Sequence, residues 1–425
     1  MRAARENRWP LPALLLGLAA LALVHWLLRD TYWDYSEGVY AMSAHLILHG
    51  HGLYTQMAGA QPPGVYLTGA VILALHDSVE WLRFGVACLQ LGAGLIAGRI
   101  VLRVTENRVA AALTPAAMLL TPWAVHEHGA LTPELVALPV LLGAALLACT
   151  PGRAPACGVL CGLLPLIKLP MAIPAVVLVL CCPDRRRCAA YAVATAAAGF
   201  GLTTALTGAD FWRETVVAQT QTGARSLGQL KGFWAQAGWN VLGLLACAAF
   251  AVRRRSLARD RRMLDVSLAL AVAMIVTFLT NFKEGTGLNI TVPVEASLVP
   301  LAACGCAFAA GPRGSRLPAA ACAIAVAFTM AQSASLIIAP RHSIPFLRAF
   351  SRPAWAILMT RGQLLAAVAT ARACPAGVPY SGPPLLALAA RRSMPAGQPD
   401  QFIISHSHEL AGFAAQIAAV PRVCP

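Results

Sequence analysis

The sequence predicts an all-α membrane protein that crosses the bilayer about eleven times. Hydrophobic residues make up 58% of its 425 residues and charged residues only 12%, whereas a soluble domain carries about 25% charged residues. A soluble fold of this length could not bury so much apolar surface, so lipid is the expected solvent. The net charge of +15 comes from short arginine clusters between apolar runs, as in loops that set membrane topology. This dispersal argues against a nucleic-acid partner.

Apolar segments that could cross the bilayer recur along the whole chain. A transmembrane helix needs roughly 20 predominantly apolar residues. Residues 156–182 are expected as two short spans with Lys168 at the turn, because a single helix would bury this lysine at mid-membrane. The other candidates are 11–28, 84–102, 109–125, 133–150, 188–206, 239–252, 263–281, 291–311 and 317–338.

Arginine-rich loops are expected in the cytoplasm, which places the N-terminus inside and the C-terminus outside. The basic start "MRAARENR" is interpreted as the flank of a retained first span rather than of a cleaved signal peptide. Residues 63–75 are apolar but short for a crossing, so a re-entrant or interfacial helix is expected there, with a crossing left open. The excess of arginine over lysine is typical of a GC-rich bacterial source.

The predicted domain organisation has two parts. Residues 1–339 form the transmembrane domain, with 29–62 as its first extracytoplasmic loop and 207–238 as an interfacial loop outside. Residues 340–425 are expected to form a small extracytoplasmic α/β segment, in which "FIIS" is interpreted as a strand and "PLLALAAR" and "ELAGFAAQIAA" as helices.

The thirteen cysteines are of two kinds. Eleven lie in or beside apolar segments and are expected as small buried hydrophobic residues. "CxxxC" at 157–161 has no histidine or acidic partner nearby, so no metal site is predicted there. Cys374 and Cys424 lie in the less apolar tail, where they could form a disulfide if the tail is outside the cell.

The first outer loop carries an unusual concentration of polar residues. Asp34 precedes a helix expected to begin near Ser36, and Glu37 lies in its first turn, where the helix dipole favours a carboxylate. Ordinary N-terminal capping is one interpretation of these residues. His45 and His49 share a helical face, but two histidines without a third ligand are a weak metal signal.

The segment "QPPG" at 61–64 predicts a rigid helix start. Two consecutive prolines cannot lie inside a helix, but they can begin one. Gln61 is therefore expected in extended conformation just before the helix, facing the same outer cavity.

The stretch "DYSEGVYAMSAHLILHGHGLYTQMAGAQPPGVYL" resembles the first extracytoplasmic loop of GT-C-fold glycosyltransferases, in particular bacterial relatives of the protein O-mannosyltransferases and aminoarabinose transferases. That family has an acidic pair followed by Gly or Ala, any residue, and Tyr, where this chain has Ser36-Glu37-Gly38-Val39-Tyr40. The base is thus left open between Asp34 and Glu37. The residue before "PP", lysine in some relatives, is Gln61 here.

The resemblance continues along the chain. "HEHGALTPEL" is similar to the family's next acidic loop, which makes Glu134 the matching carboxylate, with His126 and His128 nearby. The alternative is that Glu134 is simply a first-turn residue after Thr132-Pro133. "LLPLIKLP" resembles the family's lysine at a helix break, here Lys168.

A late loop extends the likeness. "FKEGTGLNITVPVEASLVPLA" resembles a family loop in which Lys283 and Asn289 would meet a lipid phosphate or its sugar. The alternative for Lys283 is a lysine whose side chain reaches from the bilayer to its surface.

The resemblance implies a membrane enzyme that moves a sugar from a polyprenyl-phosphate donor to an extracytoplasmic acceptor. A carboxylate would deprotonate the acceptor hydroxyl, and attack opposite the phosphate would invert the anomeric centre. Cationic side chains would stabilise the departing phosphate. The candidates are Lys168, Arg225, Lys231 and Lys283. No cofactor is expected, and the need for a divalent metal stays open.

Two other functions compete with this prediction. A transporter or flippase of a lipid-linked sugar would carry ionisable residues within its helices near mid-membrane, whereas most charges here fall in loops. A non-catalytic relative would only bind the lipid carrier. All three interpretations place the protein in the cell membrane in contact with lipid.

Overall fold

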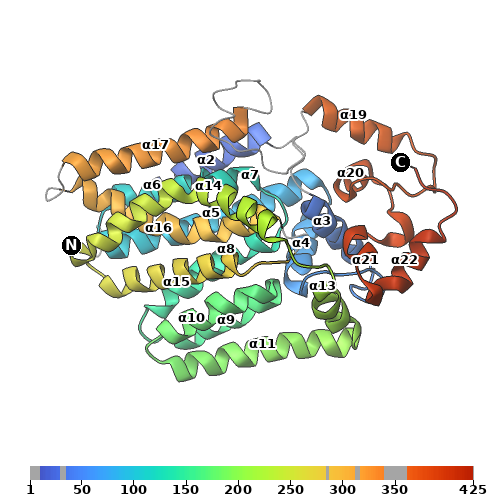
Figure 1. The fold of residues 1–425 in the computed structure, drawn as a ribbon, viewed down its shortest axis with the longest axis horizontal. Coiled ribbons are helices and arrows are strands. Elements are labelled where there is room, and N and C mark those ends of the chain that lie inside the picture. Colours follow the sequence, from blue (N-terminus) through green and yellow to red (C-terminus); the bar gives the residue numbers. More distant parts are fainter. Residues whose placement is uncertain (1–9, 29–34, 284–286, 312–315, 339–360, 425) are drawn as a thin grey trace.

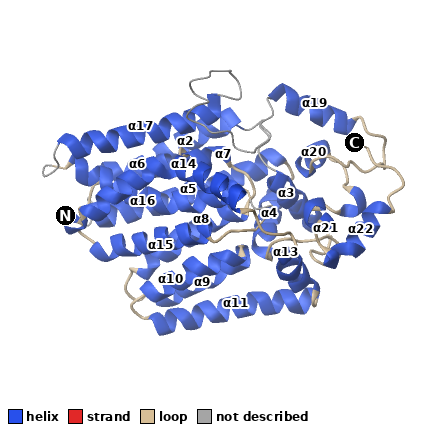
Figure 2. Cartoon of the chain, viewed as in Figure 1, coloured by secondary structure: helices blue, strands red, loops and turns tan. Residues whose placement is uncertain are grey.

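The structure is a computed structural model, and it describes residues 10–28, 35–283, 287–311, 316–338 and 361–424. These residues are almost entirely helical, with isolated β-bridges and no sheet (Figure 2). The helices are α2 (Pro10–Leu28), α3 (Tyr35–Leu48), α4 (Pro63–Leu75), α5 (Val79–Thr105), α6 (Arg108–Leu119), α7 (Pro122–His126), α8 (Pro133–Ala148), α9 (Ala154–Ile167), α10 (Ala172–Cys181), α11 (Arg185–Thr207), α12 (Asp210–Trp212), α13 (Ala218–Thr220), α14 (Leu227–Arg253), α15 (Arg261–Leu279), α16 (Thr291–Ala310), α17 (Arg316–Ile338), α19 (Arg361–Arg372), α20 (Pro384–Ala390), α21 (Gln401–Ser405) and α22 (Ala411–Ala418). Short turns join them: η1 (Leu169–Met171), the π-helical η2 (Arg213–Val217), η3 (Arg255–Leu257), η4 (Leu288–Ile290), η5 (Pro395–Gly397) and η6 (His408–Leu410).

The long helices lie side by side as one bundle, with α9, α10 and α11 along one edge (Figure 1). Helix α16 lies at the centre, where it packs against α5, α6, α8, α14 and α15. Close packing depends on a small residue, because a Cβ on Gly305 would lie 2.0 Å from the carbonyl oxygen of Cys247 in α14. Small residues at such crossings let membrane helices approach closely.

Seven described helices are long and apolar enough to cross a membrane. Helix α11 has only Cys188 buried although one face packs on α9, and its exposed leucines and valines are suited to lipid contact. The seven are α2, α5, α11, α14, α15, α16 and α17, and shorter apolar helices are α4, α6, α8, α9 and the η1–α10 segment. The chain is a multi-pass helical membrane protein, as its composition predicts.

The helix break expected at Lys168 is confirmed. Helix α9 ends at Ile167, and Lys168 has extended backbone angles before the short turn η1 leads into α10. Pro170 explains the break, because its ring removes a backbone donor from the helix. Residues 63–75 form α4 with Pro at its first position, and whether this helix crosses the bilayer stays a prediction.

Three expectations about elements are wrong. The expected span 109–125 is interrupted, because α6 ends at Leu119 and Pro122 starts the separate helix α7. The expected span 239–252 is too short, because α14 already begins at Leu227, and the interfacial position of residues 207–238 stays a prediction. "FIIS" is not a strand: Asp400 caps these residues as the short helix α21 by accepting a hydrogen bond from the Ile403 N–H, so the tail is helical where it is described.

The tail lies at one end of the bundle, beside α3 and α4 (Figure 1). Helix α20 packs on α3 so closely that a Cβ on Gly38 would lie 2.6 Å from the backbone nitrogen of Leu385. Gln398 binds the first loop by accepting from the Ala58 N–H at 2.9 Å and donating to the Gln56 carbonyl at 2.9 Å. The tail thus fixes the loop from which the site is built.

Cys374 and Cys424 are joined by a disulfide, with their Cα atoms 6.0 Å apart. The bond closes the tail on itself, and the Cys424 carbonyl oxygen accepts a hydrogen bond from the Ser381 N–H at 2.8 Å. The pairing left open by the sequence is therefore made. Disulfides persist in oxidising compartments, which fits a tail outside the cytoplasm.

Candidate functional site

Buried charges gather where α3, α5 and α8 meet the long connections between helices. Glu37, in the first turn of α3, is 1% exposed and forms a two-pronged ion pair with Arg83 of α5. The Arg83 Nε and Nη2 atoms donate to the two oxygens of Glu37 at 2.6 and 2.7 Å. A planar guanidinium matches a carboxylate in this way, so both Glu37 oxygens are engaged.

A second buried group joins three distant segments of the chain. Glu134 follows the N-cap Thr132 in the first turn of α8 and is fully buried. Its Oε1 accepts from Lys168 Nζ at the α9 break, and its Oε2 accepts from Asn289 Nδ2 of η4 at 3.2 Å. The sequence predicted all three residues, and the structure brings them into one network.

Lys283 lies close to this network. Burial lowers the pKa of Lys283 to about 8, the charge of Lys168 lowers it further, and Asp400 opposes both. Asp400 comes from the tail, and its own pKa is raised to about 6, chiefly by burial. Two lysines and one tail carboxylate are therefore near enough to influence one another's charge.

The segment before α14 reaches the same place. Ala224 and Lys283 form an isolated antiparallel bridge, and the Arg225 N–H donates to the Phe282 carbonyl at 2.8 Å. The Arg225 guanidinium lies 4.2 Å from the centre of the Phe233 ring, which is a cation–π contact. Arg225, predicted only as a candidate cation for the phosphate, thus lies beside the late loop with its charge over an aromatic ring.

Glu127 is the main residue that the sequence did not single out. It is buried after α7, and its Oε1 lies 2.9 Å from Nδ1 of His126. Burial raises the pKa of Glu127 to about 8, the charges of Glu134 and Glu37 raise it further, and Arg83 opposes the shift. The "HEH" pattern could have pointed to it, because ionisable residues at membrane spans are candidate functional residues.

His128 is buried as a neutral side chain. Neither of its ring nitrogens has a hydrogen-bond partner among the described residues. Burial lowers the pKa of His128 to about 3, with the charges of His25 and Arg83 adding to the shift. A neutral imidazole at this position leaves the positive charge of the region to Arg83 and the lysines.

Arg83 and Glu295 were also missed by the sequence. Arg83 directly precedes a predicted span, and an arginine in that position is normally interpreted as a residue that sets membrane orientation. Glu295 lies within α16, fully buried, and accepts hydrogen bonds from the backbone N–H groups of Trp123 at 3.0 Å and Ala124 at 3.3 Å. It caps the N-terminus of α7, which gives this intramembrane carboxylate a structural role.

Three predicted residues have other positions. Lys231 is exposed on α14. Asp34 lies outside the described residues. Gln61 precedes α4, and its carbonyl oxygen accepts from the Tyr54 hydroxyl at 2.7 Å. The helix start that follows it packs near the Lys168 break, because a Cβ on Gly64 would lie 2.7 Å from the Leu166 carbonyl oxygen.

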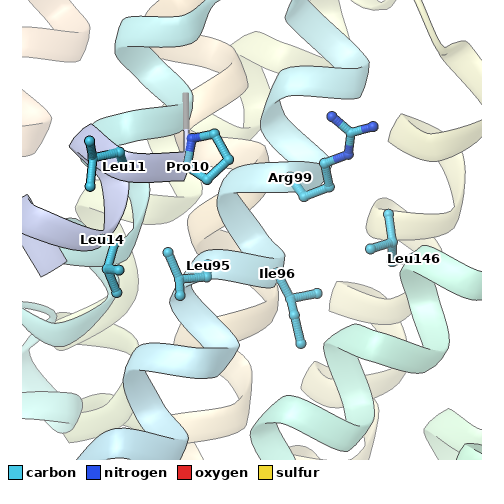
Figure 3. Close-up of a pocket in the computed structure, with 7 residues that line it drawn as sticks. All are labelled: Pro10, Leu11, Leu14, Leu95, Ile96, Arg99 and Leu146. Atoms are coloured by element: carbon cyan, nitrogen blue, oxygen red, sulfur yellow. The ribbon is translucent and has the colours of Figure 1, made fainter. Parts of the chain in front are cut away.

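Two cavities differ sharply in character. One, of about 520 Å³, is apolar apart from Arg99 and contains none of the predicted site residues (Figure 3); it is lined by Pro10, Leu11, Leu14, Leu95, Ile96, Arg99 and Leu146. The other, of about 530 Å³, lies between the start of α5 and the tail helices α19 and α20. Glu80, Arg83 and Arg372 line it, so one member of the buried ion pair, Arg83, forms part of its wall.

Two groups in the described part of the chain have side chains close enough to hold a metal ion: Cys247 with Cys306 and Cys322, and His45 with His49 and Asp77. Neither group includes a residue of the Glu134 network. The Glu134 network contains the ammonium group of Lys168, which has no lone pair to offer a metal ion.

The helical bundle, the helix break and the charged cluster beside the first loop define a polytopic membrane protein with a GT-C-like fold. Two solved structures of ArnT from Cupriavidus metallidurans, an aminoarabinose transferase with this fold, are similar to the chain. The structure bound to undecaprenyl phosphate has a TM-score of 0.62 at 17% identity and covers 97% of this chain and 88% of ArnT. The apo structure has a TM-score of 0.61 at 17% identity and covers 89% and 84%.

No protein-family model matches the chain, and no curated protein sequence matches it. The likeness is therefore one of fold, which confirms the architecture implied by the first-loop resemblance.

Proposed function

We propose that this protein is a membrane glycosyltransferase that moves a sugar from a polyprenyl-phosphate donor to an extracytoplasmic acceptor. The observation that carries the proposal is the buried network of Glu134, Lys168 and Asn289 with Lys283 beside it, in a fold shared with a protein solved with undecaprenyl phosphate. A lipid-linked phosphate needs cations at the membrane boundary, and this network supplies two.

The lysines are assigned to the phosphate. Breaking the bond between sugar and phosphate leaves negative charge on the phosphate oxygens, which fixed cationic donors stabilise. Lys168 is held by Glu134 at a helix break, so its position is set before the donor arrives. Lys283, with a pKa of about 8, is largely protonated at neutral pH and gains stability from a bound anion.

The acidic residues of the first loop receive different roles. Both oxygens of Glu37 are engaged by Arg83, which favours a positioning role for Glu37 and leaves proton acceptance to Asp34. Glu127 is a second candidate base in its ionised form, which a pKa of about 8 makes the minor form at neutral pH and the major form above pH 8. Attack on the face opposite the phosphate would invert the anomeric centre.

The outer face of the membrane is the proposed place of reaction. The disulfide between Cys374 and Cys424 favours an oxidising compartment for the tail, and the tail contributes Asp400 beside Lys283. The arginine clusters on the other connections favour the cytoplasm for the opposite end of the bundle.

The test is transfer by the purified full-length protein in lipid nanodiscs, with labelled polyprenyl-phosphate sugars and mass measurement of acceptor products. Lys168→Met is expected to lower kcat about 100-fold, the usual cost of removing one transition-state donor. Arg186→Met, an exposed cation at the start of α11, is the matched control and keeps activity.

Two outcomes would contradict the proposal. Movement of the lipid-linked sugar across vesicle membranes without any acceptor product would indicate a flippase. Donor binding that Lys168→Met weakens, with no product from any donor and acceptor pair, would indicate a protein that only holds the carrier.

A further inference from the structure

We propose that His45, His49 and Asp77 form a binding site for a divalent transition-metal ion, with Zn²⁺ as the best fit. The ligand atoms of these three side chains all lie within 4.8 Å of one another. Nδ1 of His45 is 3.0 Å from Oδ1 of Asp77, and Nε2 of His49 is 4.0 Å from Oδ2 of Asp77. His45 lies in the last turn of α3 and His49 directly follows the helix, and Asp77, from the connection between α4 and α5, supplies the third ligand that the sequence did not reveal.

The spacing fits the metal without rearrangement of the backbone. Zinc bonds of roughly 2.0–2.2 Å in tetrahedral geometry place neighbouring ligand atoms about 3.3 Å apart. The two observed distances, 3.0 and 4.0 Å, run to different oxygens of Asp77 and lie on either side of that value. A small rotation of the His49 side chain, which is 52% exposed, would close the longer one.

The hydrogen bonding of His49 prepares its other nitrogen for a metal. Nδ1 of His49 lies 2.8 Å from the carbonyl oxygen of His45. Because a carbonyl oxygen can only accept, Nδ1 carries the proton and Nε2 of the neutral ring presents a lone pair toward Asp77. Metal-binding histidines characteristically donate their second ring N–H to such a partner.

The chemistry of the ligand set selects the class of ion. Two imidazoles and one carboxylate suit zinc and neighbouring first-row metals, whereas magnesium and calcium prefer oxygen ligands alone. The side chains of His45 and Asp77 are 26% and 36% exposed, so water can reach the site and complete the coordination. Binding would replace the hydrogen bond between His45 and Asp77 with bonds from both side chains to the ion.

The site would brace the two elements that carry the buried ion pair. His45 and His49 lie at the C-terminal end of α3, whose first turn carries Glu37, and Asp77 precedes α5, which carries Arg83. His45 is about 12 Å along the helix axis from Glu37, so the metal would act on position and not on the reacting atoms. The inference is independent of sugar transfer.

The test uses metal-free, full-length protein in nanodiscs, titrated with Co²⁺ as a coloured substitute for Zn²⁺. One equivalent is expected to give the visible absorption of a nitrogen- and oxygen-bound four- or five-coordinate ion, and Zn²⁺ but not Mg²⁺ should displace it. His49→Ala and Asp77→Ala are expected to weaken binding at least 10-fold, the order of loss seen when metal-site residues are disturbed.

His51→Ala is the matched control, because His51 is an exposed histidine two residues from His49 that is not part of the group. It should bind Co²⁺ as the unaltered protein does. Zn²⁺ should also raise the thermal unfolding midpoint of the unaltered protein and of His51→Ala, but not of His49→Ala. These readouts do not depend on transfer activity.

Several results would overturn the proposal. Co²⁺ bound equally by His49→Ala, Asp77→Ala and the unaltered protein would place the ion elsewhere. A strong sulfur-to-cobalt absorption band in place of the expected spectrum would assign it to Cys247, Cys306 and Cys322. No binding at Co²⁺ in large excess over protein would show that the three side chains form only hydrogen bonds.

Discussion

At the scale of single residues, buried charges of the site are balanced side chain by side chain. Glu37 pairs with Arg83, Glu134 pairs with Lys168, and Glu295 accepts hydrogen bonds from the N–H groups of α7. A buried charge without such a partner is costly, and removing one member of a pair typically destabilises a protein by about 3–5 kcal/mol. Glu127 differs, because burial and neighbouring carboxylates favour its protonated form.

Glu127 makes stability depend on pH in a predictable direction. Its pKa is about 8 in the folded protein against 4.5 for an ordinary glutamate, so the folded state binds more protons between these values. The contribution of Glu127 to stability is therefore fully present below pH 4.5 and is lost as pH rises toward 8, by at most about 1.4 kcal/mol per pH unit. Glu127→Gln should flatten this fall in unfolding midpoints measured from pH 5 to 9.

The control for this measurement is Glu409→Gln, which removes an exposed carboxylate and should leave the slope unchanged. A slope for Glu127→Gln that matches that of the unaltered protein would contradict the assigned protonation. Both variants should be compared at one ionic strength, because salt screens exposed charges more than buried ones.

At the scale of elements, close helix contacts position the site. The α3–α20 contact depends on Gly38, whose added Cβ would lie 2.6 Å from the Leu385 backbone nitrogen. Backbone atoms cannot move aside as a flexible side chain can, so a residue larger than glycine is poorly tolerated at this contact. The same geometry at Gly64 sets α4 against the end of α9 beside Lys168.

Gly38→Ala is therefore expected to loosen the tail from α3 and to lower the unfolding midpoint, with a cost of about 1–3 kcal/mol for overpacking. Gly92→Ala in α5 is the control, because nothing lies within 4 Å of its added Cβ. That change should be neutral or stabilising by up to about 1 kcal/mol through helix propensity. Equal midpoints for the two variants would show that α20 does not press on α3.

At the scale of the whole molecule, the tail is bound to the first loop and is also closed on itself by a disulfide. Gln398 binds the backbone of the loop, Asp400 lies near Lys283, and the disulfide closes the tail over a separation of 50 residues. The tail therefore completes one side of a site whose central network comes from the middle of the chain.

Loss of the disulfide should release the tail. Closing a loop of 50 residues is worth about 4 kcal/mol in the chain-entropy description. Cys374→Ser is expected to speed protease cleavage within 361–424 severalfold, while Cys88→Ser, which removes an exposed free thiol, should not. Equal cleavage rates for both variants would show that side-chain packing alone holds the tail.

The sequence determined the class of protein and most of its helices, because apolar segments and proline positions act locally. The break at Lys168 and the start of α4 follow from Pro170 and Pro63 in this way. The same local logic predicted a strand at "FIIS", where three apolar residues, two of them β-branched, fit either element and the cap by Asp400 decided for a helix.

The sequence by itself also determined that Glu134, Lys168 and Asn289 were worth attention, since their residue types and flanking motifs are visible in the chain. Only the tertiary structure decided which of them meet, and it added Arg83, Glu127 and Asp77. Asn289 and Glu134 are 155 residues apart in the chain, and Arg83 and Glu37 are 46 apart. Which of such distant residues pair depends on how the helices pack and on the cost of leaving a buried charge unpaired. Neither can be predicted from a local sequence pattern.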